Sequence, residues 1–229
     1  MEHGEGLWML VMIATGLSGL AMTAGATMAW RARRPGLAAA LAGGVAGVGA
    51  LYLVVLVTVS LASPRHVLAA GEVKRFCGLY LDCHLGVSVD GVRTASTLGE
   101  GERRVTARGT YRLVTLRVSS NAVAATLTPD GLEAQVVDDH GRRYLRDRAA
   151  ERALLGAEQG LEAPVRAGGS YTRTLVFDLP ADASNPALAV SERGFPDALI
   201  ETFLIGDEDS LFHRPTLLGL AMTGSAGPR

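Results

Sequence analysis

Charged residues are absent from two long stretches near the start of this 229-residue chain. None occurs in "LWMLVMIATGLSGLAMTAGATMAW", residues 7–30, and none in "GLAAALAGGVAGVGALYLVVLVTVSL", residues 36–61. A helix of about 20 residues crosses the hydrocarbon core of a bilayer, and each run is longer than that. Backbone polar groups inside lipid must be satisfied within their own segment. The two runs therefore favour a pair of membrane-spanning helices over buried core helices of a soluble protein.

Basic residues are also lacking ahead of the first run, where the chain carries Glu2 and Glu5 but no lysine or arginine. A cleaved signal peptide would have a basic leader and a shorter apolar stretch. The small residues "AGA" at 24–26 resemble a cleavage site, but the other two features do not fit. We predict that the first helix is retained.

Lysine is nearly missing: the chain has one, against 21 arginines, a bias typical of a GC-rich genome. Residues 63–229 hold 19 basic and 21 acidic residues, which excludes an electrostatic nucleic-acid binder. No nucleophile-elbow, phosphate-loop or dinucleotide-binding glycine pattern occurs. We predict that the protein is not an enzyme and that it holds no cofactor.

Arginine is concentrated instead in the short connector 31–35, which carries Arg31, Arg33 and Arg34. Short basic loops stay in the cytoplasm, so both the N-terminus and the chain after the second run should lie outside. Trp8 and Trp30 would be about 33 Å apart along a helix, which suits the two interfacial belts of a bilayer. These features predict a two-pass protein of the bacterial inner membrane with a periplasmic C-terminal domain.

Small residues recur at intervals of four along both predicted helices, a spacing that lets helices approach closely in lipid. They are Ala21, Gly25 and Ala29 in the first helix and Ala39, Gly43 and Gly47 in the second. Two interpretations stay open, because these faces can pack the two helices on each other or dock another membrane subunit.

Beyond residue 63 the sequence alternates apolar and polar residues, as strands with one buried face do. Such stretches cover residues 84–92, 110–120, 132–138, 170–180, 187–192 and 216–222, with a polar loop expected at 94–109 and a short helix within 147–159. We predict a transmembrane helical hairpin followed by an all-β antiparallel sandwich, which the resemblance described below implies to be immunoglobulin-like. The predicted boundaries are 1–62 for the hairpin, 63–83 for a linker, 84–222 for the sandwich and 223–229 for a disordered tail.

The only two cysteines, Cys77 and Cys83, lie six positions apart, and His84 follows directly. Outside the cytoplasm the surroundings are oxidising, so we expect a Cys77–Cys83 disulfide that pins the linker to the first strand. Haem attachment needs two residues between the cysteines, and this spacing does not fit. A metal site built on Cys77, Cys83 and His84 is the remaining alternative.

Two further stretches could face a partner. The apolar segment 195–206 includes Phe195, Leu199, Ile200 and Phe203, and it could be core, membrane-facing or partner-facing. Arginines gather at Arg142, Arg143, Arg146, Arg148 and Arg152, which favours a solvated surface or a patch for an anionic partner.

The hairpin pattern "VDDHGRRY" at 137–144 and the strand ending "FDLP" at 177–180 carry a resemblance. They resemble the telokin-like, immunoglobulin-like domains of many bacterial membrane-anchored proteins. The ending "LIGDEDSLFHRPTLLGL" is similar to the C-terminus of uncharacterised two-helix membrane proteins from GC-rich bacteria. This resemblance covers about residues 76–220 and implies a fold, with no catalytic residues to transfer.

These observations together predict a non-catalytic accessory subunit that docks in the membrane and braces a larger complex of integral membrane subunits. A respiratory or photosynthetic assembly would fit, but no residue identifies one. The alternative is a free-standing envelope module that binds a ligand or senses stress. A redox or metal-binding protein that uses the cysteine–histidine segment is the least favoured interpretation.

Overall fold

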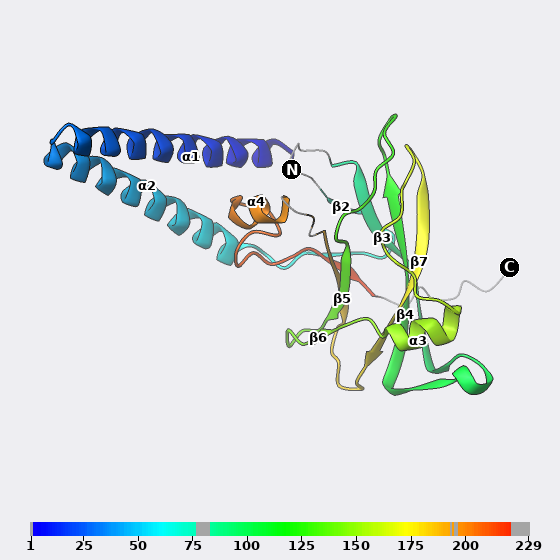
Figure 1. Ribbon diagram of the computed structural model, residues 1–229. Coiled ribbons are helices and arrows are strands. Elements are labelled where there is room, and N and C mark those ends of the chain that lie inside the picture. Colours follow the sequence, from blue (N-terminus) through cyan, green and yellow to red (C-terminus); the bar gives the residue numbers. More distant parts are fainter. Residues whose placement is uncertain (1, 77–82, 193, 195–196, 221–229) are drawn as a thin grey trace. The chain divides into compact units, whose positions relative to one another are not determined.

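A computed structural model of the chain describes residues 2–76, 83–192, 194 and 197–220 (Figure 1). The chain divides into two compact units. The helical unit combines Met1–Pro64 with the later segment Ala198–Arg214, and the sandwich unit combines Arg65–Asp197 with Pro215–Arg229. Within the predicted range 84–222, the segment Ala198–Arg214 therefore belongs to the helical unit. The sandwich unit begins earlier than predicted, at Arg65 in the predicted linker.

The helical unit begins with α1 (Glu2–Arg31) and α2 (Pro35–Ala62), which confirm the two predicted helices. Pro35 stands in the first turn of α2, where its missing N–H costs no hydrogen bond. Between them the chain reverses through Arg33, whose φ of 55° is left-handed, while the Arg34 N–H donates to the Ala29 carbonyl. Both helices are long and apolar enough to cross a membrane.

The sandwich unit consists of two sheets of short and long strands (Figure 1). One sheet has the order β1-β9-β8-β5-β6, formed by β1 (Val67–Leu68), β9 (Leu217–Gly219), β8 (Ala187–Ser191), β5 (Glu133–Val137) and β6 (Arg143–Tyr144). The other has the order β2-β3-β4-β7, formed by β2 (Lys74–Phe76), β3 (Leu85–Leu98), β4 (Val105–Ser120) and β7 (Ser170–Leu179). All neighbours are antiparallel except β1 and β9, which run parallel and so depart from the predicted pattern.

The two sheets share one core. Successive side chains of a strand point to opposite faces, so every second residue points inward. Leu116 of β4 and Phe177 of β7 are fully buried in this core together with Leu188 of β8 and Leu218 of β9. A second, smaller cluster lies under α3 (Arg148–Leu155), which confirms the predicted short helix. Asp147 caps α3, since its carboxylate accepts from the Ala150 N–H at 2.9 Å.

The polar stretch 94–109, predicted as a loop, is instead the outer part of the β3–β4 hairpin. Leu98 pairs with Val105, and the connection between the strands, residues 99–104, contains the short 3-10 turn η1 (Gly101–Arg103). Leu98 is buried, and Ala107 packs against the same cluster as Ala150 of α3. These strand ends could not be predicted from the sequence, because most residues of 94–109 are polar.

The predicted linker 63–83 also contributes structure to the sandwich. Its strand β1 pairs with β9, and its strand β2 pairs with β3. The chain's one lysine, Lys74 of β2, is buried, and its ammonium group donates to the Val190 carbonyl at 2.6 Å. Since Val190 belongs to the opposite sheet, the lysine ties the two sheets together with a charge-assisted hydrogen bond.

Burial in the shared core predicts a sharp contrast between two leucines. Leu188 is fully buried, whereas Leu145 is 75% exposed. Leu188→Ala should lower the free energy of unfolding of the sandwich by about 2–5 kcal/mol, because it removes apolar contact and leaves a cavity. The control Leu145→Ala should stay within about 0.5 kcal/mol of the parent. Urea-dependent pulse proteolysis of the full chain in detergent would measure both, and equal effects would contradict this description of the core.

Candidate functional site

The α1–α2 contact uses only part of the small residues singled out in the sequence. A Cβ added to Gly25 of α1 would lie 3.2 Å from Leu41 Cδ1, and one added to Gly44 of α2 would lie 3.1 Å from Met22 Sδ. Ala29 of α1 is buried as well, at 6% exposure. Glycine at positions 25 and 44 therefore lets the two backbones approach closely, in the manner of small-residue packing in lipid.

The predicted small-residue face of α2 is turned away from this contact. Ala39, Gly43 and Gly47 are exposed, and a Cβ added at either glycine would meet nothing within 4 Å. One residue along a helix corresponds to a rotation of about 100°, so Gly43 and its neighbour Gly44 face different directions. Ala21 of α1 is exposed too. The structure thus assigns Gly25 and Ala29 to the hairpin itself and leaves the α2 face open.

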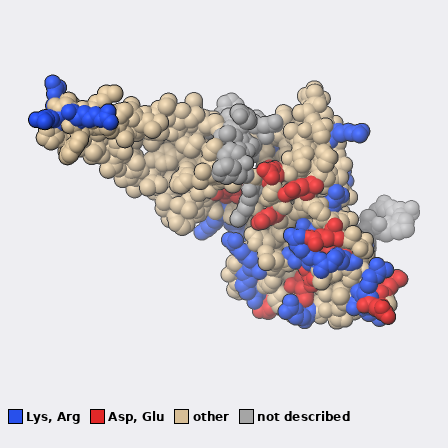
Figure 2. Space-filling model, in the orientation of Figure 1, with Lys and Arg blue, Asp and Glu red and all other residues tan. Residues whose placement is uncertain are grey.

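The turn between the helices carries the charge of this unit. Arg31, Arg33 and Arg34 are all exposed. On the face drawn in Figure 2 the surface of the helices is uncharged along its length, and basic residues appear at the turn. Trp30, next to the turn, is 72% exposed, whereas Trp8 near the other end of α1 is half-buried.

The segment Ala198–Arg214, which we call the α4 segment, includes most of α4 (Asp197–Phe203) and is attached to α2 by side-chain hydrogen bonds. The Tyr52 hydroxyl donates to the Phe203 carbonyl at 2.6 Å. The hydroxyl oxygens of Ser60 and Ser210 lie 3.1 Å apart, and both residues are buried. Sequence reasoning missed these anchors, although hydroxyl groups near the end of an apolar helix were an available signal.

The end of the α4 segment is held in the same way. The Arg214 N–H donates to Ser63 Oγ at 3.0 Å, just past the end of α2. Next to it, burial lowers the pKa of His213, against the opposing effects of the Arg214 backbone and Glu208. Its Nδ1 is buried without a hydrogen-bond partner among the described residues.

The arginine cluster of 142–152 is largely neutralised by nearby carboxylates. Arg142 pairs with Asp138 at 2.7 Å and with Asp182 at 2.6 Å. Burial by itself would raise the pKa of Asp138, but hydrogen bonds from Arg142, Tyr144 and the His140 backbone lower it to about 2. The carboxylate thus organises the "VDDHGRRY" hairpin, and the Arg142 guanidinium is already paired with two carboxylates. Arg143 is exposed.

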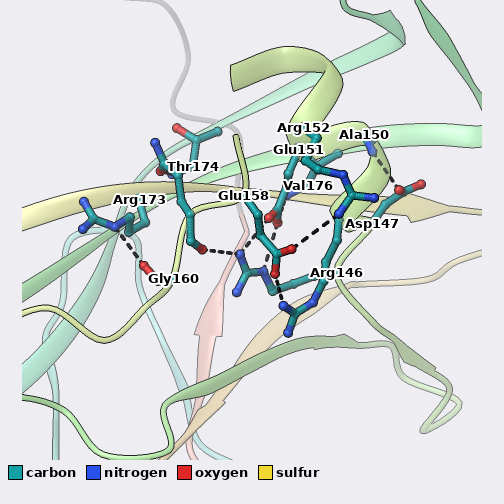
Figure 3. A network of polar contacts seen from close by, with 12 residues as sticks. Arg146, Asp147, Ala150, Glu151, Arg152, Glu158, Gly160, Arg173, Thr174 and Val176 are labelled. Carbon is teal, nitrogen blue, oxygen red and sulfur yellow. Dashed lines mark hydrogen bonds and ion pairs between the residues drawn. The ribbon is translucent and has the colours of Figure 1, made fainter. Parts of the chain in front are cut away.

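The remaining arginines of the cluster belong to a network around α3 that covers the outer edge of the terminal strand β7 (Figure 3). Glu151 is fully buried and accepts from the Val176 N–H at 3.1 Å, while the Asp147 N–H donates to the Val176 carbonyl at 2.7 Å. Arg146, which is 10% exposed, holds the Glu151 carboxylate at 2.9 and 2.7 Å. Free backbone groups on an edge strand invite pairing with another chain, and this network satisfies both backbone groups of Val176.

Of the cysteine–histidine segment, Cys77 lies outside the described residues, so the expected disulfide stays a prediction. His84 is exposed, and its Nδ1 lies 2.8 Å from the side-chain amide of Asn121. Within the described ranges no group of three histidine, cysteine or acidic side chains could hold a metal ion. Phe195, predicted as part of a partner surface, also lies outside these ranges, whereas Ile200 is half-buried and Leu199 and Phe203 are exposed.

No family model matches the chain, and no curated protein matches its sequence. Several solved structures align with it, among them the following three. MPT63, a secreted protein from Mycobacterium tuberculosis, is 16% identical with a TM-score of 0.42 over 57% of this chain and 92% of that one. The yjhA protein from Bacillus subtilis is 11% identical with a TM-score of 0.41 over 67% of this chain and 99% of that one. An uncharacterised β-sandwich protein from Clostridium difficile is 7% identical with a TM-score of 0.35 over 58% of this chain and 91% of that one. Such weak likeness carries no argument about function.

The edge network predicts different costs for two glutamates near α3. Glu151→Ala should destabilise the sandwich by about 3–5 kcal/mol, because it leaves the buried Arg146 charge unpaired. The control Glu158→Ala should cost less than about 1 kcal/mol, because its partners Arg148 and Arg152 are more than half exposed. Chemical denaturation measures both changes. Light scattering should show more self-association for Glu151→Ala alone, and equal behaviour of the two variants would contradict the proposed covering of the β7 edge.

Proposed function

We propose that this protein is a non-catalytic accessory subunit, anchored by α1 and α2 in a membrane and joined there to other integral membrane subunits. The observation that carries the proposal is the open face of Ala39, Gly43 and Gly47 on a helix whose packing against α1 is already complete elsewhere. In lipid, such a face gains by close packing against another helix, since lipid tails supply no hydrophobic drive for association.

Membrane insertion is supported by the surfaces of the helices. In an apolar 18-residue stretch of α1, 0% of the residues are buried, and in such a stretch of α2, 11% are buried. Core helices of a soluble protein would be mostly buried. The hydroxyl groups of Thr23, Thr27 and Thr58 each donate to the carbonyl four residues earlier, at 2.7–2.9 Å. These polar groups are thus satisfied within their own helix, as lipid requires.

The orientation follows from the exposed arginines of the α1–α2 turn, which favour the cytoplasmic side of a bacterial inner membrane. The sandwich, which we take to be telokin-like from its "VDDHGRRY" hairpin, would then lie in the periplasm. There the Cys77–Cys83 pair would be oxidised. The compact core and the covered β7 edge suit a rigid domain that braces a partner's outer parts.

Docking through the open face is tested by replacing its glycines with a large residue. Gly43→Leu together with Gly47→Leu should remove the protein from the large complex with which it co-migrates after gentle detergent extraction of native membranes. The matched control is Gly16→Leu with Gly19→Leu on α1, where added Cβ atoms also meet nothing within 4 Å. The control should co-migrate like the parent chain. A parent that migrates alone, or a Gly43/Gly47 variant that stays in the complex, would refute the proposal.

Orientation is tested by two single cysteines at exposed sites and a membrane-impermeant maleimide. Leu145→Cys in the sandwich should be labelled in intact spheroplasts, whereas Ala32→Cys in the arginine turn should react only after permeabilisation. The parent chain should react only after reduction, because its native cysteines are expected to be bridged. The opposite pattern for positions 145 and 32 would place the sandwich in the cytoplasm, and labelling of the unreduced parent would argue against the disulfide.

A further inference from the structure

The α4 segment follows the last turns of α2 rather than crossing it. Its contact with Tyr52, through Phe203, and its contact with Ser60, through Ser210, lie eight residues apart on the helix. At a rise of 1.5 Å per residue, these contacts are separated by about 12 Å along the helix axis. The segment therefore extends along the part of α2 that lies farthest from the arginine turn.

One side of the α4 segment is buried and the other is exposed and apolar. Leu204 and Ile205 are 6% and 1% exposed. Facing away are large apolar side chains with high exposure: Leu199 (55%), Phe203 (43%), Leu211 (39%) and Phe212 (61%). The buried residues pack the segment against its own unit. The exposed apolar residues form a patch of the kind that marks an interaction with a protein or a membrane.

The backbone at Phe212 adds an independent sign that this exposure is built in. Its φ is 67°, a left-handed conformation that is strained for a bulky residue without glycine's freedom. Such strain persists only where the surroundings hold it, and it clusters at functional positions. The residue in this conformation is 61% exposed.

The level of the segment on α2 indicates what covers its apolar side. If the hydrocarbon core begins near Leu37, about 20 residues bring its far boundary to about Leu56. Tyr52 lies about 6 Å inside that boundary and Ser60 about 6 Å outside it. Phe203 is then at acyl-chain depth, while Asp207, Glu208 and Asp209, which directly precede Ser210, are at headgroup depth.

This arrangement matches an interfacial amphipathic segment, whose apolar side chains enter the boundary between headgroups and acyl chains by about 5–10 Å. At the same level of α2, Leu51 and Val54 are exposed apolar residues as well. Near the other helix, a Cβ added to Gly206 would lie 3.3 Å from Trp8 Cδ1, and tryptophan is typical of this depth.

We propose that the α4 segment is a lipid-binding element that rests in the leaflet opposite the arginine turn and inserts Leu199, Phe203, Leu211 and Phe212 among the lipids. The inference rests on the proposed insertion of α1 and α2. It adds that the chain returns from the sandwich to touch lipid a third time, between β8 and β9. The occupant is the lipid itself and not a partner subunit.

The test uses fluorescent probes on single cysteines in the full chain, with both native cysteines replaced by serine. Leu199→Cys and Phe212→Cys report on the segment, Leu20→Cys on mid-span lipid and Leu145→Cys on water. The purified protein is reconstituted into phosphatidylcholine–phosphatidylglycerol vesicles that carry nitroxide lipids, labelled either at the headgroup or near the end of the acyl chain. Quenching by each nitroxide is then compared among the four positions.

The probe at Leu20 should be quenched by the acyl-end nitroxide, and those at Leu199 and Phe212 by the headgroup nitroxide several-fold more than the probe at Leu145. If the Leu20 probe is quenched but those at Leu199 and Phe212 behave like Leu145, helix insertion stands and lipid binding by the segment is refuted in favour of a protein partner. If the Leu20 probe is not quenched, insertion itself has failed and the inference falls with it.

A second set of variants covers failure of the serine background to fold. Leu20→Trp, Phe212→Trp and Leu145→Trp retain the native cysteines and share the same background from Trp8 and Trp30. The quenching in excess of that of the parent chain should follow the order expected for the cysteine probes. The acyl-end nitroxide should quench Leu20→Trp, and the headgroup nitroxide should quench Phe212→Trp more than Leu145→Trp. An excess at Phe212→Trp no larger than that at Leu145→Trp would overturn the proposal.

Discussion

The apolar sides of α1 and α2 need a covering other than water, and the proposals for this protein all depend on that constraint. The largest apolar patch on an ordinary soluble monomer covers about 300–600 Å². Here two helices of 30 and 28 residues expose large apolar side chains along their length, from Leu10 and Leu20 on α1 to Leu51 and Leu61 on α2. In the proposed function lipid is this covering, and the turn of three arginines would set the direction of the pair across it.

Small residues serve two purposes within the same helical pair. Gly25 and Gly44 allow the backbones of α1 and α2 to come close, whereas Gly43 and Gly47 leave a smooth surface facing outward. Adjacent glycines thus have different neighbours because a helix turns by about 100° per residue. The α4 segment adds a third kind of surface, apolar and rich in bulky side chains, which suits lipid better than close helix packing.

The sandwich is organised differently, since its polar groups are largely satisfied by one another. Glu151 and Arg146 cover the edge of β7, Asp138 organises the β5–β6 hairpin, and Lys74 joins the two sheets. Buried charges with complete hydrogen bonding favour one defined arrangement over its alternatives, although they add little net stability. A domain of this kind is suited to holding a fixed surface in place.

Several features of the chain could be predicted from its sequence. Long uncharged runs predicted α1 and α2, and alternation of apolar residues predicted most strands, because both signals depend on neighbours close in sequence. The loop expected at 94–109 was wrong, since the apolar partners that stabilise those strands, Ala150 and Leu154, come from the distant α3. The arginine cluster was also ambiguous, because its neutralising carboxylates Asp182 and Glu158 are brought close only by folding.

The sequence by itself determined the apolar helices, their basic turn and the strand-rich character of the remainder. Only the tertiary structure decided which small residues close the hairpin, which face stays open, and that Ala198–Arg214 belongs with the helices rather than with the sandwich. The reason is physical: composition and periodicity report how a segment meets its surroundings. Pairing between Tyr52 and Phe203, 151 residues apart, depends on how the whole chain folds.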